Sequence, residues 1–541
     1  MHNSQLVAAN GAAGVSTVET LATDGDTDVL QSADATLDLT GMTLTNIDYV
    51  LNTGGMDTTI VMDADDLGAG KVRIVGSADA NGADVLATND GTLNVAGVAL
   101  SNIDTLTVDA DGNTDSAQTI TVAANQVGAA AGKVSTITSG NAGQTVTLTT
   151  ADDLFDLTGV TLTNIDTVDN TFAGSSAITV ANEQLFAAGG WVTAVTTAAN
   201  ALDTDILQMA ASGTFDLSGV TLTNIDRIQG TAGVDSITGA SGNDTIAGGG
   251  GADVMNGGAG NNVFVFNTGD VASGETITFG GTSDAFRVDT ATDFSAMNAG
   301  ALLTGLDAVT MAADQGGTFL GAQLTGLTFT VNGDNNGAIE VVTVNGTADG
   351  ATTADTINLA NVTVQNGAGI RINGNDGADI ITGTAGNDTI TGGTGADRID
   401  VGSGTDKVVV RVGDSGVNAA AGVSVATAAF DIYSGLGVGD TLELFLNPTF
   451  NHFAAVSTSD TDVSGANDTI LFTRGTYSAV NHLFTAGAAG SDTLVTYDVT
   501  TPTSGGGPLY QSIVLVGFVG LSDVGTTASG MGGNVTLTAF G

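Results

Sequence analysis

Residues 230–265 read GTAGVDSIT GASGNDTIA GGGGADVMN GGAGNNVFV, which are four nine-residue repeats in one unbroken frame. The same pattern returns from Gly374 as GNDGADIIT GTAGNDTIT GGTGADRID, and VGSGTDKVV follows from Val401. Every repeat has glycine at position four and an apolar residue at position eight, and all but one have aspartate at position six. A period this short and regular predicts a stack of nearly identical turns.

The shared positions define the residues of interest. Position four is occupied by Gly233, Gly242, Gly251, Gly260, Gly377, Gly386, Gly395 and Gly404. Position six is occupied by Asp235, Asp244, Asp253, Asn262, Asp379, Asp388, Asp397 and Asp406. Position eight is occupied by Ile237, Ile246, Met255, Phe264, Ile381, Ile390, Ile399 and Val408.

The residue types at these positions point to metal-binding chemistry. Glycine permits a tight turn with bare backbone carbonyls, the aspartate supplies a hard oxygen ligand, and the apolar residue points inward from a three-residue strand. Two repeats close one coil, so each turn lies below the turn two repeats later. Carboxylates stacked in this way repel unless a cation with six or more oxygen ligands lies between them, which describes Ca²⁺ better than Mg²⁺. The expected pairs are Asp235 with Asp253, Asp244 with Asn262, Asp379 with Asp397, and Asp388 with Asp406.

A longer repeat precedes the first block of nonapeptides. LDLTGMTLTNIDYV (37–50) returns nearly unchanged at 93–106, 155–168 and 215–228, and its glycines are separated by 56, 62 and 60 positions. Alternating apolar and polar residues within each copy predict short strands with one buried face. A solenoid coil takes about 20 residues, so each unit of roughly 60 residues should form about three coils that bury one another's faces.

The Asn-Ile-Asp triplets of these copies end in Asp48, Asp104, Asp166 and Asp226. Turn capping through the backbone is the favoured interpretation of these aspartates, because Asn and Asp commonly stabilise turns in this way. Ca²⁺ ligation is the alternative that the sequence leaves open.

Charge and composition exclude several classes of function. Ten Lys and Arg face 58 Asp and Glu, a formal charge of −48, which argues against nucleic acid and against docking on an anionic membrane. There is no cysteine, so stabilising cross-links would have to come from metal ions. The longest apolar run, Ile513–Leu521, is too short to span a bilayer as a helix, and no membrane insertion is expected.

The nonapeptides resemble the Ca²⁺-binding β-roll repeats of RTX proteins. That resemblance implies Ca²⁺ as the cofactor, export by a type I secretion system with an uncleaved C-terminal signal, and an extracellular or cell-surface location. The segments SDTLVTYDV and QSIVLVGFVGLSDV look like the terminal region of such proteins. The repeat style of the whole chain resembles RTX-containing surface-layer and extracellular matrix proteins of Gram-negative bacteria.

We therefore expect an all-β fold, a parallel β-solenoid (β-helix) with two Ca²⁺-binding RTX β-roll blocks and a β-rich C-terminal region. The expected divisions are a solenoid of about four repeats at 1–229, β-roll blocks at 230–266 and 374–410, a solenoid-like segment at 267–373, and a C-terminal region with the secretion signal at 411–541.

The leading functional hypothesis is a secreted, calcium-binding structural protein that assembles with copies of itself into a surface layer, sheet or filament. The alternative is a secreted adhesin or biofilm-matrix protein that contacts cell-surface glycans. A polysaccharide-modifying enzyme on a β-helix is a remote third hypothesis, because a polyuronate substrate needs a cationic groove and the chain has only ten basic residues. No catalytic residues are proposed, and the protein is not expected to be an enzyme.

Overall fold

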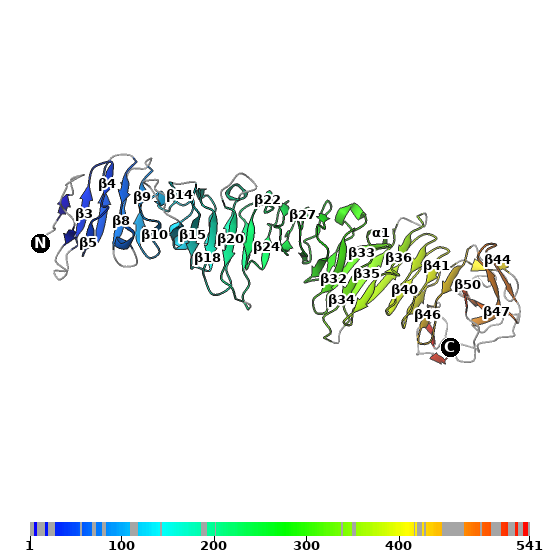
Figure 1. Ribbon diagram of the computed structural model, residues 1–541. Coiled ribbons are helices and arrows are strands. Elements are labelled where there is room, and N and C mark those ends of the chain that lie inside the picture. The colour runs from blue at the N-terminus through cyan, green and yellow to red at the C-terminus, as the bar shows by residue number, and fades with distance from the viewer. Residues whose placement is uncertain are drawn as a thin grey trace. The chain divides into compact units, whose positions relative to one another are not determined.

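The computed structural model describes a chain built almost entirely from short strands (Figure 1). The residues described are 5–7, 17–19, 27–54, 57–67, 72–77, 83–108, 117–140, 143–185, 192–200, 202–336, 339–348, 353–415, 417–418, 425–426, 429–445, 470–486, 489–498, 510–517, 525–527 and 534–538. They form two compact units, Met1–Val263 and Phe264–Gly541.

The first unit is a parallel β-solenoid, as the alternating pattern predicts. Its strands pair with strands one coil away, and each sheet collects strands that are far apart in sequence. One sheet contains β1 (Gln5–Val7), β3 (Val29–Ser32), β6 (Tyr49–Asn52), β8 (Arg73–Val75) and β11 (Ala99–Ser101), and β2 (Thr17–Glu19) pairs with β5 (Thr43–Thr45). A second contains β4 (Thr36–Asp38), β7 (Thr59–Val61), β9 (Val85–Ala87), β12 (Thr105–Val108), β14 (Thr136–Ser139) and β17 (Thr161–Thr163).

The remaining strands of this unit continue the same stacking. A third sheet contains β10 (Thr92–Asn94), β13 (Gln118–Thr121), β15 (Val146–Thr150), β18 (Thr167–Asn170), β20 (Ala194–Thr197) and β23 (Thr221–Thr223). Another sheet contains β16 (Leu154–Asp156), β19 (Ala177–Val180), β21 (Ile206–Met209), β24 (Arg227–Gln229) and β26 (Thr245–Ala247). A further sheet contains β22 (Thr214–Asp216), β25 (Ser236–Thr238) and β27 (Val254–Asn256).

The coils of the long repeats are more variable than the sequence suggested. Val29 stands opposite Tyr49 in one coil, whereas Thr105 stands opposite Thr136 in another, so the length of chain between paired strands differs from coil to coil. Most of these coils are longer than the expected length of about 20 residues. Each long repeat therefore forms fewer than the three coils expected from the sequence. The extra residues lie in the turns, some of which contain one-turn 3₁₀ helices: η1 (Ala64–Asp66), η2 (Ala124–Gln126) and η3 (Asn182–Gln184).

Two of these turns contain a buried or half-buried glutamine that ties one coil to the previous one. The Gln184 side-chain amide donates to the carbonyls of Leu157 and Val160 at 2.9 and 2.7 Å, and its Oε1 accepts from the Ala181 backbone. Gln126 makes the equivalent bonds one repeat earlier. Backbone carbonyls that a turn would otherwise leave unpaired inside the solenoid are thereby satisfied.

The second unit begins as a parallel solenoid. After β28 (Val263–Phe266) and β29 (Thr276–Thr278) come β30 (Asp284–Val288), β32 (Leu306–Met311), β34 (Thr330–Asn332) and β37 (Thr363–Gln365), with η5 (Met297–Gly300) and α1 (Gly321–Leu324) in the turns. A second sheet runs β31 (Thr292–Asp293), β33 (Gly316–Leu320), β35 (Val341–Asn345), β38 (Gly369–Asn373), β40 (Asp388–Thr391), β42 (Lys407–Val410), β46 (Thr441–Phe445), β52 (Asn534–Thr538) and β51 (Gly525–Thr527).

The C-terminal part of this unit changes to antiparallel pairing. Its sheet runs β36 (Thr356–Asn358), β39 (Ile380–Thr382), β41 (Arg398–Asp400), β45 (Asp431–Ser434), β50 (Tyr510–Leu515), β49 (Asp492–Asp498), β47 (Ile470–Ser478), β48 (Leu483–Ala486) and β44 (Val425–Ala426), and β43 (Val417–Asn418) also pairs with β50. Pairing is parallel up to the β45–β50 pair and antiparallel from β50 through β49 and β47 to β48. The fold is thus the expected all-β parallel solenoid with a β-rich C-terminal region.

Candidate calcium sites

Each nonapeptide forms a glycine-rich turn followed by a short strand. The residue at position six lies at the point where the turn enters the strand, and the residue at position eight points into the core. All eight position-eight side chains are buried, as the sequence predicts. All eight position-six side chains are also buried, although seven of them are carboxylates. The repeats therefore place a charged column beside an apolar one along the same stack.

The structure brings together every pair expected from the two-repeat coil. Strands β25 and β27, β39 and β41, and β40 and β42 pair in parallel with an 18-residue offset. In each pair the backbone N–H of the earlier position-six residue donates to the side-chain Oδ1 of the later one. The distances are 2.9 Å for Asp235 to Asp253, 3.0 Å for Asp244 to Asn262, 2.9 Å for Asp379 to Asp397, and 2.9 Å for Asp388 to Asp406.

The second oxygen of several of these carboxylates has no hydrogen-bond donor. Within the described part of the chain, the Oδ2 atoms of Asp244, Asp379, Asp397 and Asp406 are buried without a hydrogen-bond partner. A buried polar atom left in this state costs roughly 1–3 kcal/mol, and more when it is charged. These oxygens are consequently the atoms that a cation would satisfy.

The position-four glycines bring stacked turns into close contact. A Cβ on Gly251, Gly260, Gly395 or Gly404 would meet the carbonyl oxygen of the glycine one coil earlier, which is Gly233, Gly242, Gly377 or Gly386 respectively. Gly260 and Gly395 also have φ of +93° and +148°, which side chains other than glycine rarely adopt. Only glycine permits this approach, and the carbonyl of the earlier turn then faces the later turn.

The buried position makes these carboxyl groups hold protons at unusually high pH. Burial raises the pKa of Asp388 and of Asp397 from 3.8 to about 7, and the charges of Asp406 and of Asp379 and Asp414 add to the respective shifts. Burial likewise raises the pKa of Asp244, Asp379 and Asp406 to about 6. The ionised form of each group is thus disfavoured in the folded chain, and a bound cation would favour it.

The donors assembled here fit Ca²⁺. They are hard oxygens, carboxylate and backbone carbonyl, and the turns that carry them stack so closely at Gly251, Gly260, Gly395 and Gly404 that a side chain there would meet the neighbouring turn. Asn262 offers an amide oxygen in place of a carboxylate, so the pair with Asp244 has one negative charge fewer than the others.

The residues of the nonapeptide blocks match the family model described as the RTX calcium-binding nonapeptide repeat, in four copies, over residues 224–269 and 373–408. Both nonapeptide blocks are therefore RTX repeats. The two RTX blocks therefore bind Ca²⁺, and RTX repeats occur in proteins that are secreted by type I systems. No curated protein matches the chain. Among the described residues, no helix is long and apolar enough to cross a membrane.

The Asn-Ile-Asp aspartates outside the RTX blocks make a bond of the same kind. The side chain of Asp104 accepts from the Asp84 backbone at 3.1 Å, and that of Asp166 accepts from the Val146 backbone at 2.8 Å. Asp48 and Asp226 make the equivalent bonds at 2.8 Å. The asparagine of every triplet has a positive φ between 54° and 59°. Each of these aspartates thus caps a turn of the preceding coil and not the turn of its own triplet. Ca²⁺ binding by these aspartates stays a prediction.

Three aspartates in the same columns lie outside the repeats that the sequence identified. The backbone of Asp355 donates to Asp379 at 2.8 Å, that of Asp397 to Asp431 at 3.0 Å, and that of Asp406 to Asp440 at 2.7 Å. The two aspartate columns of the second RTX block therefore extend beyond it. Asp355 precedes the block in one column, and Asp431 and Asp440 follow it, one in each column. A search that required the full glycine pattern could not find these residues.

Proposed function

We propose that the protein is a secreted structural protein that Ca²⁺ makes rigid and that assembles with copies of itself into a surface layer, sheet or filament. The assignment of the sixteen position-four and position-six residues as the Ca²⁺ sites is part of this proposal. Type I export and a position at the cell surface follow from the same RTX character.

The observation that carries the assembly proposal is a regular uncharged surface on the first unit. Strands β12, β14 and β17 place two threonines each on their outward face, and parallel register aligns them in two rows. One row contains Thr105, Thr136 and Thr161, and the other contains Thr107, Thr138 and Thr163. We call these six residues the threonine rows. None of them is fully buried.

Charge explains why such a surface suits contact between copies. A chain with a formal charge of −48 repels its own copies over roughly 8 Å at physiological ionic strength. Close contact is therefore favoured where the surface is uncharged or where cations bridge carboxylates. The threonine rows offer an uncharged, β-branched and repetitive patch of this kind, and repetition suits a lattice in which the same contact recurs.

The test is assembly of the purified protein. We expect it to be monomeric in chelator and to form ordered sheets or filaments in millimolar Ca²⁺, followed by light scattering and negative-stain imaging. The variant Thr107→Asp/Thr138→Asp should fold but fail to assemble, because it adds like charges to the rows. Thr158→Asp, on an exposed turn of the same unit, is the matched control and should assemble normally. A protein that remains monomeric at high concentration in Ca²⁺ would refute the proposal.

One cleft favours the second candidate function, a secreted adhesin that contacts acidic cell-surface glycans. A cavity of about 640 Å³ lies over strands β38, β40 and β42 and is lined by Arg371, Lys407 and Arg411, three of the ten basic residues of the chain. Thr389 on β40 stands opposite Arg371 on β38 and opposite Lys407 on β42, so it lies between the two basic residues. Three carboxylates, those of Asp376, Asp414 and Glu443, line the same cavity and balance these charges, and Lys407 pairs with Glu443 at 2.7 Å. Binding of an acidic polysaccharide that Arg371→Ser weakens would support this function over a purely structural one.

A further inference from the structure

A nonapeptide frame continues beyond the second RTX block after an interruption. Residues 426–434 read ATAAFDIYS and residues 435–443 read GLGVGDTLE. Asp431 and Asp440 occupy position six of these two segments, and Tyr433 and Leu442 occupy position eight. Position four is alanine and valine instead of glycine, and the family match ends at residue 408. The segment has the spacing of the repeat without its position-four glycines.

The strands of this segment form the next coil of the β-roll. Strand β45 pairs with β41 so that Tyr433 stands opposite Ile399, and β46 pairs with β42 so that Leu442 stands opposite Val408. Tyr433 and Leu442 are fully buried, as every other position-eight residue is. We call residues 426–443 the terminal coil.

The aspartates of the terminal coil accept the same backbone N–H hydrogen bond that links the position-six residues of the RTX blocks. Asp431 Oδ1 accepts from the Asp397 backbone at 3.0 Å, and Asp440 Oδ1 accepts from the Asp406 backbone at 2.7 Å. The corresponding bonds between Asp379 and Asp397 and between Asp388 and Asp406 are both 2.9 Å. The chain has additional residues between Val410 and the terminal coil, so the sequence offset across the new bonds is larger than in the repeats. Geometrically this insertion leaves both aspartate columns unbroken.

Two buried carboxylate oxygens at these positions have no hydrogen-bond donor, and a cation would satisfy both. Within the described chain, the Oδ2 atoms of Asp397 and Asp406 have no hydrogen-bond donor, and these residues are 0% and 1% exposed. The Tyr497 hydroxyl is also buried and without a partner. Its pKa lies well above the usual range because of burial and the nearby charges of Asp431 and Asp414.

Asp431 lies among other buried acidic groups. Asp431 is fully buried, and the Tyr433 hydroxyl donates to its Oδ2 at 3.3 Å. Burial and the charges of Asp397 and Asp414 hold the pKa of Asp431 well above its ordinary value. Three carboxyl groups and two phenols thus lie in one buried region, and no described basic side chain pairs with Asp431.

We propose two further Ca²⁺ sites on the terminal coil, one between Asp397 and Asp431 and the other between Asp406 and Asp440. This inference rests on the assignment of the position-six carboxylates as Ca²⁺ ligands. It extends that assignment to a coil that lacks the glycine signature. Carbonyl oxygens of the turns would complete each ligand shell, as in the RTX blocks.

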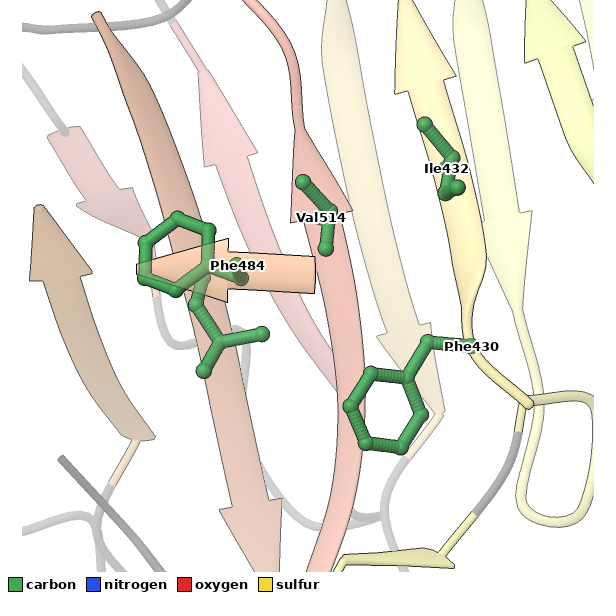
Figure 2. Close-up of a cluster of buried hydrophobic side chains, with 5 residues drawn as sticks. Phe430, Ile432, Phe484 and Val514 are labelled. Carbon is green, nitrogen blue, oxygen red and sulfur yellow. The ribbon is translucent and has the colours of Figure 1, made fainter. Parts of the chain in front are cut away.

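The same strand ties these ions to the C-terminal sheet. Phe430 and Ile432 flank Asp431 in sequence and pack in a buried cluster with Phe484, Leu494 and Val514 (Figure 2). Figure 2 shows Phe430 and Ile432 near β45 and Val514 on the neighbouring strand β50. An ion at Asp431 would therefore fix the strand against which the antiparallel sheet packs.

Ca²⁺ stoichiometry measured by titration calorimetry on the full chain tests the proposal. Asp431→Asn and Asp440→Asn should each bind one ion fewer than the wild type. Asp253→Asn, in the first RTX block, is the matched control and should also lose one ion. If the control loses an ion and neither terminal-coil variant does, the terminal sites are wrong while the RTX assignment stands. If the control loses none, the RTX assignment itself fails.

Terbium luminescence gives an independent readout. Tb³⁺ bound at the Asp397–Asp431 site should be sensitised through Tyr433 and Tyr497, so excitation of tyrosine should produce terbium emission. Asp431→Asn should abolish most of this emission, whereas Asp440→Asn and Asp253→Asn should retain it. The double variant Tyr433→Phe/Tyr497→Phe covers the case in which Asp431→Asn fails to fold. It should lose the emission and keep the wild-type Ca²⁺ stoichiometry, and unchanged emission would overturn the Asp397–Asp431 site.

Discussion

Replacing Asp388 by asparagine should change stability in opposite directions with and without Ca²⁺. In the folded chain Asp388 is 2% exposed, and its carboxylate accepts hydrogen bonds from the Thr384 backbone at 2.6 Å and from the Thr384 hydroxyl at 3.0 Å. Asparagine has nearly the same shape and keeps an acceptor for Thr384. The backbone bond from residue 388 to Asp406 is also kept. The substitution therefore removes mainly a charge.

The magnitude follows from the pKa of the carboxyl group. Burial raises the pKa of Asp388 from 3.8 to about 7 in the folded, calcium-free block. A raised pKa gives stability that is fully present below the unfolded value and is lost as the pH rises through the folded value. A shift of about three pKa units corresponds to about 4 kcal/mol at pH 8. Asparagine never ionises, so the calcium-free variant should be more stable than the wild type by about this amount at pH 8 and equally stable near pH 4.

With Ca²⁺ bound the sign should reverse, because the variant has lost a ligand that stabilises the folded state by binding. Urea unfolding followed by circular dichroism, at several pH values in calcium-free buffer and in millimolar Ca²⁺, measures both effects. Asp166→Asn is the control, since Asp166 makes the equivalent bond to the Val146 backbone outside the RTX blocks. Destabilisation by Asp388→Asn in both media at pH 8 would refute the reasoning, because it would show that the carboxylate stabilises the block without a cation.

Three more predictions test the repeats. Gly260→Ala should destabilise the Ca²⁺-bound protein by about 1–2 kcal/mol or more and lower its melting temperature, because φ is +93° and the new Cβ would press on the carbonyl of Gly242. Gly242→Ala is the control and should change the melting temperature little, because its Cβ would meet nothing within 4 Å. Equal shifts in the two variants would contradict this account. Gln184→Ala should cost about 2–4 kcal/mol in urea unfolding, since two buried carbonyls lose their donor, and a change near zero would mean that water replaces the amide. Chelation should reduce the β-sheet circular dichroism signal, and Ca²⁺ should restore it where equal Mg²⁺ does not; full recovery in Mg²⁺ would exclude the flexible, carbonyl-rich site assumed here.

The parts of the fold that the sequence predicts are those governed by strict periodicity. A nine-residue frame fixes the 18-residue offset, and this alone places Asp379 beside Asp397 and buries Ile381 and Ile399 together. The position-four glycines were also predictable, because no other residue combines a tight turn with such close stacking. Register and burial in the RTX blocks are therefore consequences of spacing.

The parts that the sequence did not predict depend on insertions and on individual side chains. Coil length in the first unit varies because turns accept extra residues without disturbing the paired strands, so a single mean coil length is a poor guide. Asp431 and Asp440 escaped notice because an insertion breaks the frame and alanine and valine replace glycine. The role of Gln184 depends on the carbonyls of Leu157 and Val160 in the preceding coil, which no local pattern reveals.

The same aspartate bond occurs throughout the chain, but its consequence depends on burial. Asp104 and Asp166 are only half-buried, and Asp48 and Asp226 are exposed, so water can solvate the oxygen that the backbone does not use. In the RTX blocks the equivalent residue is at most 7% exposed, because glycine-rich turns pack so closely that water has little access. The charge of the second oxygen must then be balanced from within. We therefore expect a stacked aspartate to require Ca²⁺ only where its carboxylate is buried. On this argument the terminal coil, whose Asp431 and Asp440 are as buried as those of the repeats, belongs with the RTX blocks, and the four Asn-Ile-Asp aspartates do not.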